Sequence, residues 1–222
     1  MNAFATTDVG IERNVNQDYV YAKLDDIGCL PNLFIVADGM GGHKAGDTAS
    51  RYTVETLVEL LKESEGKDPL ATIDNNIKLV NTLLLRKAGE SEEYNGMGTT
   101  LVVASIFDNT LRVANVGDSR LYVIGEDIIQ ITRDHSWVEE MVQRGEIDRK
   151  AARTHEKKNV ITRAIGGYDT VEAEIVQDGK SFMRARTTEI LEPSPDRIQP
   201  PCPFVGICGG CSWGNLSRTA QL

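Results

Sequence analysis

The chain has 222 residues, enough for one domain with a sizeable core, and 41% hydrophobic and 26% charged residues are typical of a globular protein. No apolar run reaches the roughly eighteen residues of a transmembrane helix, and the first residues lack the apolar block of a secretory signal, so we expect a cytoplasmic protein that does not contact membranes. The net charge of -9 argues against unaided nucleic-acid binding and favours cations as partners.

Composition changes along the chain. Residues 1–179 hold 19 basic and 30 acidic residues, whereas residues 180–222 hold five basic and three acidic ones. Five of the seven prolines and three of the four cysteines also lie beyond residue 180. This change predicts two segments, residues 1–177 and residues 178–222, of which the second is poorly ordered.

Apolar periodicity predicts alternating strands and helices in the first segment. The run Leu33–Ala37 is apolar throughout, which predicts a strand buried on both faces. Three strands after residue 98 have the spacing of an antiparallel meander. The predicted strands are Tyr19–Leu24, Leu33–Ala37, Thr99–Phe107, Leu111–Val116, Arg120–Ile124 and Val171–Val176. The predicted helices are Ala45–Glu63, one through Ile73 and Leu84, Trp137–Arg144 and Arg149–Arg163.

Asp38 begins a glycine-rich stretch, Asp-Gly-Met-Gly-Gly-His, directly after the predicted strand Leu33–Ala37. A carboxylate at such a strand end is costly to hold unpaired, and a hard divalent cation is the usual compensation. The glycines would let the backbone approach an ion or a phosphate closely. The alternative is an Asp-Gly turn with a solvated carboxylate.

The stretch from Asp8 to Asp18 is rich in hydrogen-bonding groups and precedes a predicted strand. The planar fork of Arg13 suits a phosphate, and Asp18 offers an oxygen ligand or an acceptor for a metal-bound water. The alternative is a solvated loop with an incidental ion pair. Two further motifs, at residues 96–100 and 115–120, are interpreted as turns that support a site without supplying ligands.

Six motifs in order carry a resemblance over roughly residues 1–176. They are Gly10-x-x-Arg13-x-x-Asn16-Gln17-Asp18, Asp38-Gly39-Met40-Gly41-Gly42-His43, Gly96-x-Gly98-Thr99-Thr100, Asn115-Val116-Gly117-Asp118-Ser119-Arg120, Thr132-Arg133-Asp134-His135-Ser136 and Asn159-x-Ile161-Thr162-Arg163-Ala164-Ile165-Gly166. Together they resemble the bacterial branch of the type 2C metal-dependent protein serine/threonine phosphatases.

The resemblance implies an α+β fold, an α-β-β-α sandwich of two antiparallel sheets flanked by helices. It also implies hydrolysis of phosphoserine and phosphothreonine by a water held between two Mn²⁺ or Mg²⁺ ions. Asp38 would bridge the metals and the Gly39 carbonyl would bind one of them. Asp18 would lie in or next to the coordination shell, and Arg13 would hold the substrate phosphate. His43 would donate a proton to the leaving alkoxide, or else cap the next helix or face solvent. The segment 136–155 matches the position of the family's flap.

The sequence departs from the family's pattern after Gly166. Two further metal aspartates are expected there, in a Ser-Asp-Gly turn and an Asp-Asn turn, and neither turn is present. The fold is therefore expected to be incomplete at the C-terminus. Because hard cations need several anionic oxygens, we expect one weak metal site and reduced turnover.

The second segment resembles a different family, the S-adenosylmethionine-dependent uracil-5-methyltransferases of ribosomal RNA. The match rests on Pro193-Ser194-Pro195-Asp196-Arg197 and on three spaced cysteines, and it corresponds to the end of an RNA-binding barrel domain and the start of an iron-sulfur motif. Cys202, Cys208 and Cys211 could hold zinc or part of a cluster, or be inert thiols.

Three hypotheses follow from these patterns. The first is a monomeric phosphatase acting on phosphoproteins made by a bacterial serine/threonine kinase. The second is a non-catalytic module that binds phosphoproteins or metal. The third is an RNA-associated iron-sulfur protein acting through residues 178–222, since the main segment is not expected to bind nucleic acid.

Overall fold

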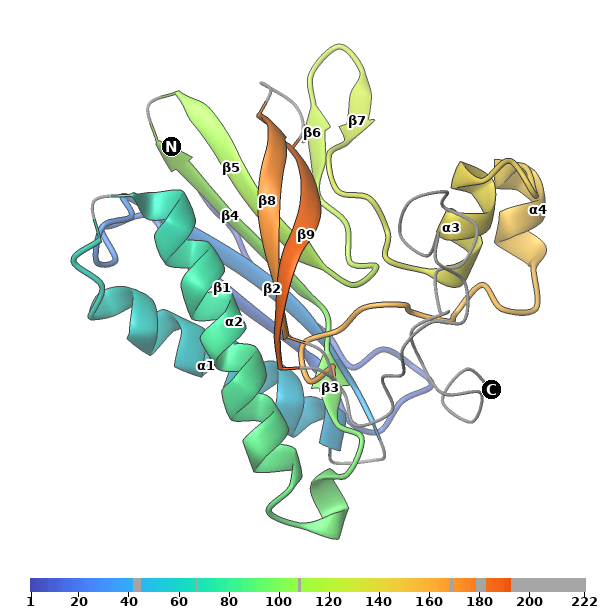
Figure 1. The fold of residues 1–222 in the computed structure, drawn as a ribbon, viewed down its shortest axis with the longest axis horizontal. Coiled ribbons are helices and arrows are strands. Elements are labelled where there is room, and N and C mark those ends of the chain that lie inside the picture. Colours follow the sequence, from blue (N-terminus) through green and yellow to red (C-terminus); the bar gives the residue numbers. More distant parts are fainter. Residues whose placement is uncertain (42–44, 67, 108, 168–169, 179–182, 193–222) are drawn as a thin grey trace. The chain divides into compact units, whose positions relative to one another are not determined.

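The structure is a computed structural model that describes residues 1–41, 45–66, 68–107, 109–167, 170–178 and 183–192 (Figure 1). The chain divides into two compact units, residues 1–167 with 175–185, and residues 168–174 with 186–222. The expected mixed α+β architecture with antiparallel sheets is confirmed. Within the described ranges, no helix has the length and apolar character needed to cross a membrane.

The larger sheet lies in the first unit and has the strand order β1-β2-β4-β5. These strands are β1 (Asp18–Lys23), β2 (Leu33–Met40), β4 (Leu101–Phe107) and β5 (Thr110–Val116). The short strand β3 (Gly98–Thr99) pairs with the end of β2. All pairs are antiparallel, and the register of β1 with β2 makes Asp18 the direct partner of Asp38.

Two helices, α1 (Ala45–Lys62) and α2 (Pro69–Ala88), cover one face of this sheet (Figure 1). The fully buried stripe of α1, which includes Leu57, packs with alternate residues of β2 such as Ile35 in one apolar core. Burial of these side chains is the main force that holds the helices on the sheet. The helix α2 is capped at its N-terminus by Asp68, whose carboxylate accepts from the N–H groups of Leu70 and Ala71 at 2.9 and 3.3 Å.

The prediction that the strand Leu33–Ala37 is buried on both faces was wrong. Leu33, Ile35 and Ala37 are buried against the helices, but Val36 on the opposite face is 45% exposed. Successive side chains of a strand point to opposite faces, so burial on both faces needs a layer on each side. An apolar run alone does not show whether the second layer is present.

The predicted three-stranded meander is only partly correct. Strands β4 and β5 pair as expected, but β6 (Tyr122–Ile124) pairs with β7 (Ile128–Gln130), a strand that was not predicted. The residues between β5 and β6 instead form hydrogen bonds with the residues after β7. The Leu121 N–H donates to Thr132 Oγ1 at 2.9 Å, and the His135 N–H donates to the Gly117 carbonyl at 2.9 Å. These contacts lead the chain away from β5 and into a separate hairpin.

The remaining elements are the helical turn η1 (Glu92–Tyr94), α3 (Trp137–Gln143), α4 (Arg149–Thr154), β8 (Thr170–Asp178) and β9 (Met183–Glu192). The predicted helix Arg149–Arg163 stops at Thr154. Residues 160–165 form backbone hydrogen bonds with other segments instead of continuing the helix. The Trp137 N–H donates to the Val160 carbonyl at 2.9 Å, and Thr99 forms an antiparallel β-bridge with Ile165. The predicted strand Val171–Val176 lies within β8, and β9, which was not predicted, pairs with it.

Candidate active site

Two carboxylates, Asp18 and Asp38, form the centre of the site. They are direct cross-strand partners at the ends of β1 and β2, and both are exposed. Directly opposed residues of an antiparallel pair project from the same face of the sheet, with their Cβ atoms only about 5 Å apart. Like charges so placed repel each other, so the backbone pairing itself concentrates negative charge at this edge.

The pKa of Asp38 reflects the proximity of these carboxylates. Burial of part of its carboxyl group, the neighbouring Asp18 and, less strongly, Asp118 together raise the pKa of Asp38 to about 6, and the charge of Arg13 opposes this shift. A carboxyl whose ionised form is this unfavourable gains from a nearby cation. The arrangement therefore fits a divalent cation or another positive group between the carboxylates.

Buried threonines fix the backbone of Asp38. The Asp38 N–H donates to Thr100 Oγ1 at 2.9 Å, and the Asp38 carbonyl accepts from the Thr100 N–H at 2.9 Å and from Thr99 Oγ1 at 3.0 Å. Thr100 Oγ1 also lies 2.7 Å from Ser119 Oγ. The motif at residues 96–100 therefore holds the backbone that carries Asp38.

Gly39 is required by a close approach of three chain segments. A Cβ at this position would lie 1.9 Å from the Gly46 carbonyl oxygen of α1 and 2.9 Å from that of Gln17. The Gly39 N–H donates to the Gln17 carbonyl at 3.0 Å, which also accepts from Ser50 Oγ at 2.6 Å. These contacts thus hold the end of β2 against the start of α1 and the residue before β1, beside the carboxylates.

The N-terminal loop places Arg13 near the carboxylates. Its Nη1 donates to Gln17 Oε1 at 3.4 Å, and its charge reaches Asp38. The Asp18 N–H donates to Asn16 Oδ1 at 3.0 Å, and Asn16 Nδ2 donates to Thr7 Oγ1 at 2.8 Å. The loop is held by its own polar groups, and the guanidinium of Arg13 remains exposed.

Asp118 joins the site although its sequence motif was interpreted as a turn. It follows Gly117 at the end of β5, and its charge contributes to the raised pKa of Asp38. Burial and the neighbouring Asp134 raise the pKa of Asp118 itself. A signal was available in the sequence, since Asp118 follows a strand end as Asp38 does. Strand β4 pairs antiparallel with both β2 and β5, so β2 and β5 run in the same direction and end at the same edge of the sheet. This places Asp38 and Asp118 at one edge, which the motif alone did not show.

The turn before Asp118 is fixed by a histidine. Gly117 has φ +102°, and its N–H donates to His135 Nδ1 at 3.1 Å. Burial and the charges of Arg163 and Arg133 lower the pKa of His135 to about 4, so the ring is neutral and accepts this bond. His135 therefore has the structural role that was predicted for it.

Several predicted site residues lie outside the described residues. These are His43 and the three tail cysteines, Cys202, Cys208 and Cys211. Among the residues that the structure does describe, no three His, Cys, Asp or Glu side chains are grouped closely enough to hold a metal ion. Asp18 and Asp38 are thus only a partial donor set, which suits a hard cation but leaves coordination positions to other ligands.

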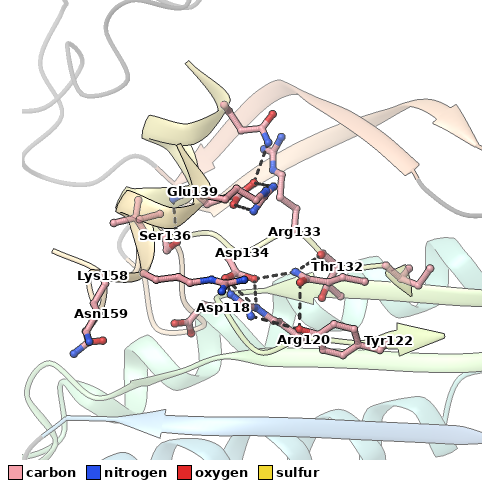
Figure 2. Close-up of a pocket in the computed structure, with 17 residues that line it drawn as sticks. Asp118, Arg120, Tyr122, Thr132, Arg133, Asp134, Ser136, Glu139, Lys158 and Asn159 are labelled. Carbon is pink, nitrogen blue, oxygen red and sulfur yellow. Dashed lines mark hydrogen bonds and ion pairs between the residues drawn. The ribbon is translucent and has the colours of Figure 1, made fainter. Parts of the chain in front are cut away.

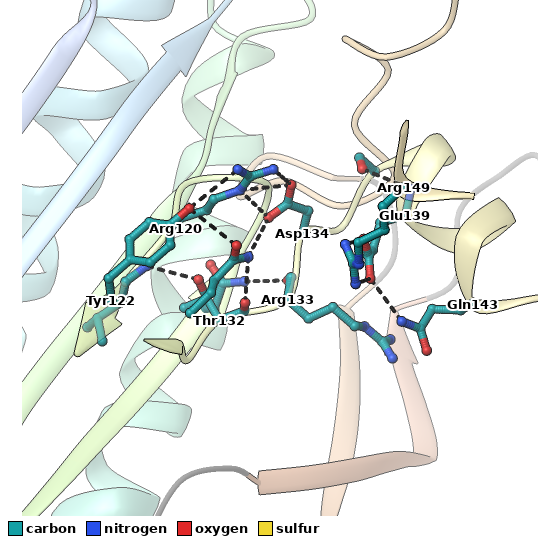
Figure 3. A network of polar contacts seen from close by, with 12 residues as sticks. Arg120, Tyr122, Thr132, Arg133, Asp134, Glu139, Gln143 and Arg149 are labelled. Atoms are coloured by element: carbon teal, nitrogen blue, oxygen red, sulfur yellow. Dashed lines mark hydrogen bonds and ion pairs between the residues drawn. The ribbon is translucent and has the colours of Figure 1, made fainter. Parts of the chain in front are cut away.

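A groove of about 1100 Å³ adjoins this centre (Figure 2). We call it the hairpin groove; it lies between the β6–β7 hairpin with residues 131–136 on one side and helices α3 and α4 with residues 158–159 on the other. Asp118 is part of its lining. Figure 3 shows the polar network of its walls, in which Arg120 binds Asp134 and Arg149 binds Glu139.

Comparison with known proteins gives consistent similarities. Residues 11–158 match the family described as protein phosphatase 2C. Protein phosphatase PhpP of Streptococcus pneumoniae (strain D39) is 37% identical over 182 residues, which cover 76% of this chain and 69% of that protein.

Two solved structures extend the comparison. Serine/threonine phosphatase Stp1 from Staphylococcus aureus has a TM-score of 0.67 and 39% identity over 72% of this chain and 64% of that one. The catalytic domain of the phosphatase PstP, in complex with 2 manganese ions, has a TM-score of 0.61 and 30% identity over 82% of this chain and 70% of that one. The present chain thus spans slightly less than two thirds of the Staphylococcus aureus structure.

Proposed function

Because the chain belongs to the protein phosphatase 2C family, we propose that it hydrolyses phosphoserine and phosphothreonine in other proteins. The observation that carries the proposal is the cross-strand pair of Asp18 and Asp38, with Arg13 and Asp118 close enough to act on the pKa of Asp38. Phosphoryl transfer depends on positioning and on neutralising charge, and this edge of the sheet combines acidic cation ligands with an exposed guanidinium.

Arg13 binds the substrate phosphate in this proposal. Its planar guanidinium can donate two parallel hydrogen bonds to phosphate oxygens, and the side chain is exposed at the edge of the site. Since its charge already acts on Asp38, a phosphate bound to Arg13 would lie beside the acidic pair. Attack on phosphorus would then take place next to the carboxylates.

Asp38, Asp18 and the Gly39 carbonyl would hold Mn²⁺ or Mg²⁺ in this proposal. Bound divalent ions lower the pKa of a water and neutralise the charge that develops on the phosphoryl group. The repulsion between Asp18 and Asp38 supports such a role, because a cation relieves it. The residues after Gly166 include neither the Ser-Asp-Gly turn nor the Asp-Asn turn that the family has there, so we infer that these 222 residues hold one of the two ions weakly and turn over slowly.

His43 is proposed as the proton donor to the leaving alkoxide, on the basis of its place in the Asp-Gly-Met-Gly-Gly-His motif. The substitution His43→Gln tests this role. A proton donor would be needed less for para-nitrophenyl phosphate, whose leaving group is already stable as an anion, than for a phosphothreonine peptide. Equal losses with both substrates would argue against the role.

The direct test is hydrolysis of a phosphothreonine peptide with added Mn²⁺, comparing the 222-residue chain with Asp38→Asn. Loss of a cation that supplies several kcal/mol of stabilisation should lower kcat/KM by about two orders of magnitude. Asp25→Asn is the matched control, since Asp25 is an exposed aspartate after β1, outside the site. Equal activity in Asp38→Asn and the control would exclude Asp38 from the chemistry.

A second candidate function is binding of phosphoproteins without turnover. It is favoured by the small number of carboxylates grouped at the site in the described residues. Calorimetric titration with Mn²⁺ and with the phosphothreonine peptide separates the two functions. A module of this kind would bind the peptide through Arg13, lose affinity in Arg13→Ala and release no phosphate.

Residues 178–222 are proposed to be a separate segment from the phosphatase-like residues 1–177. The support is the change in charge, proline and cysteine content near residue 178. An RNA-associated iron-sulfur function of this segment would require bound iron, which elemental analysis of anaerobically purified protein measures directly. We further propose a cytoplasmic monomer whose substrates are phosphoproteins made by a bacterial serine/threonine kinase.

A further inference from the structure

The hairpin groove reaches the proposed site of phosphate hydrolysis. Asp118 lines the groove, and its charge also raises the pKa of Asp38. A substrate whose phosphate lies beside Asp38 would therefore have the groove available for its neighbouring residues. With a volume of about 1100 Å³, the groove is at the upper end of the range for small-molecule sites and can hold a stretch of extended chain.

The acidic side chains in the outer groove are already neutralised (Figure 3). Asp134 accepts from Arg120 Nε at 2.8 Å and from Gln130 Nε2 at 3.2 Å, and its side chain is 11% exposed. Glu139 is 9% exposed and accepts from Arg149 at 2.8 and 3.1 Å and from Gln143 at 2.9 Å. These carboxylates hold the two walls in shape and have little remaining attraction for a cationic ligand.

Three basic side chains of the lining, Arg133, Arg153 and Lys158, differ from these pairs. All three are exposed, and none has a side-chain hydrogen bond or ion pair within the described residues. Figure 2 shows that Arg133 and Lys158 come from opposite sides of the groove. In a chain with a net charge of -9, such a group of free cations is a local departure from the overall charge. It creates a positive potential that favours anionic partners.

We propose that the hairpin groove binds an acidic segment of the phosphoprotein substrate, with Arg133, Arg153 and Lys158 pairing with Asp or Glu residues that flank the phosphorylated residue. This proposal rests on the proposed phosphatase function and names the class of substrate. The groove contributes affinity and selectivity, while hydrolysis takes place at Asp38. An acidic flank fits because its charge complements the free cations, and extended chain fits the volume.

The test uses four fluorescein-labelled peptides of one length with the 222-residue chain. They combine threonine or phosphothreonine with flanks of aspartate or asparagine, and fluorescence anisotropy measures Kd in Mn²⁺ buffer at low ionic strength. Exposed ion pairs are weak individually, but three together should make the aspartate phosphopeptide bind about tenfold more tightly than the asparagine one. The preference should shrink in high salt because the Debye length shortens.

Substitutions in the groove and beside it show which side chains cause the preference for aspartate flanks. Arg153→Gln combined with Lys158→Gln removes two of the three free cations and should reduce the preference for aspartate to about twofold. Lys150→Gln is the control, since Lys150 lies on α4 beside Arg149 and is exposed but is not part of the groove lining. Circular dichroism of each variant checks that it is folded. The charge reversal Lys158→Glu should lower the affinity for the aspartate peptide further.

The four peptides separate this proposal from the proposed function. A preference for aspartate flanks that falls to about twofold in the double variant supports the groove, whether or not the phosphate contributes. Equal affinity for aspartate and asparagine flanks, no binding of the aspartate peptides, or an equal effect of Lys150→Gln would overturn it. The phosphatase proposal fails on a different comparison, in which phosphothreonine and threonine peptides bind alike and no phosphate is released.

Discussion

At the scale of single residues, one buried hydroxyl connects the two turns that carry the central carboxylates. Thr100 Oγ1 accepts from the Asp38 N–H at 2.9 Å and lies 2.7 Å from Ser119 Oγ, next to Asp118. Thr100 is 0% exposed, so water cannot replace these bonds. The position of Asp38 thus depends on a residue that cannot itself act on a substrate.

The substitution Thr100→Val should separate this role from packing. It keeps the shape of the side chain but leaves the Asp38 N–H without this acceptor, so we expect the free energy of unfolding to fall by about 2 kcal/mol. Urea denaturation measures the loss. Thr100→Ser keeps the hydroxyl and loses only the methyl group, so it should retain most of the hydrogen-bond contribution; little or no loss in Thr100→Val would show that the hydroxyl does not stabilise this turn.

His135 gives the chain a pH-dependent stability. Its pKa is lowered from 6.5 to about 4 by burial and by Arg163 and Arg133, with Asp134 opposing the shift. The unfolded state therefore binds the proton more readily than the folded state. The stability is fully present above pH 6.5, falls as the pH drops from 6.5 to about 4, and the total loss from this group is about 3 kcal/mol.

Urea unfolding of the wild-type chain and of His135→Gln at several pH values between 4 and 7 checks this prediction. The glutamine side chain does not titrate, so the fall in stability over this range should be smaller in the variant by up to the same amount. Parallel profiles for the two proteins would show that His135 is not the group that titrates.

At the scale of elements, the sequence was most informative where the apolar pattern was long. The helix expected at Ala45–Glu63 is α1 (Ala45–Lys62), because its apolar stripe at helical spacing has one sheet face to cover. The sequence was less informative for polar segments whose conformation depends on contacts with residues distant in the chain. The helix expected to reach Arg163 ends at Thr154, because the Thr162 N–H must donate to the His135 carbonyl at 2.8 Å.

Gly117, at the junction after β5, is a position where both the backbone conformation and a close contact disfavour a side chain. Its φ of +102° disfavours any residue with a Cβ, and a Cβ there would lie 2.7 Å from the Thr100 side chain. We expect Gly117→Ala to lower the free energy of unfolding by about 3 kcal/mol.

Gly145→Ala is the matched control for this junction. Gly145 also has positive φ, +72°, but a Cβ there meets nothing within 4 Å. Its cost should be the backbone strain alone, about 1 kcal/mol. Chemical denaturation of the two variants gives the comparison, and equal losses would mean that contact with Thr100 does not matter.

At the scale of the whole molecule, stability comes from one helical layer packed on one face of the β1-β2-β4-β5 sheet. Leu57 of α1 is 0% exposed in this core, whereas Leu79 of α2 is 43% exposed. The opposite face of β2 exposes Val36. The helices α1 and α2, together with β2 and β4, contribute most of the buried apolar side chains in the core of the first unit.

Leu57→Ala should therefore destabilise the first unit by about 3 kcal/mol, through lost transfer free energy and the cavity that remains. Leu79→Ala removes the same atoms from a half-exposed position and should cost less than about 1 kcal/mol. Thermal and urea unfolding followed by circular dichroism measure both. Similar losses in the two variants would contradict a core centred between α1 and the sheet.

The sequence by itself determined the family and the helices α1 and α2, and it predicted a site at Asp38, because each depends on local order: motifs with fixed spacing, apolar periodicity and a carboxylate at a strand end. Only the tertiary structure decided which residues surround Asp38. The β1–β2 register brings Asp18 directly opposite, and the turn held by His135 brings in Asp118 from eighty residues away. The hairpin groove likewise consists of residues from the β6–β7 hairpin and from α3 and α4. Contacts between distant segments depend on strand register and chain reversal, which single-sequence patterns do not encode.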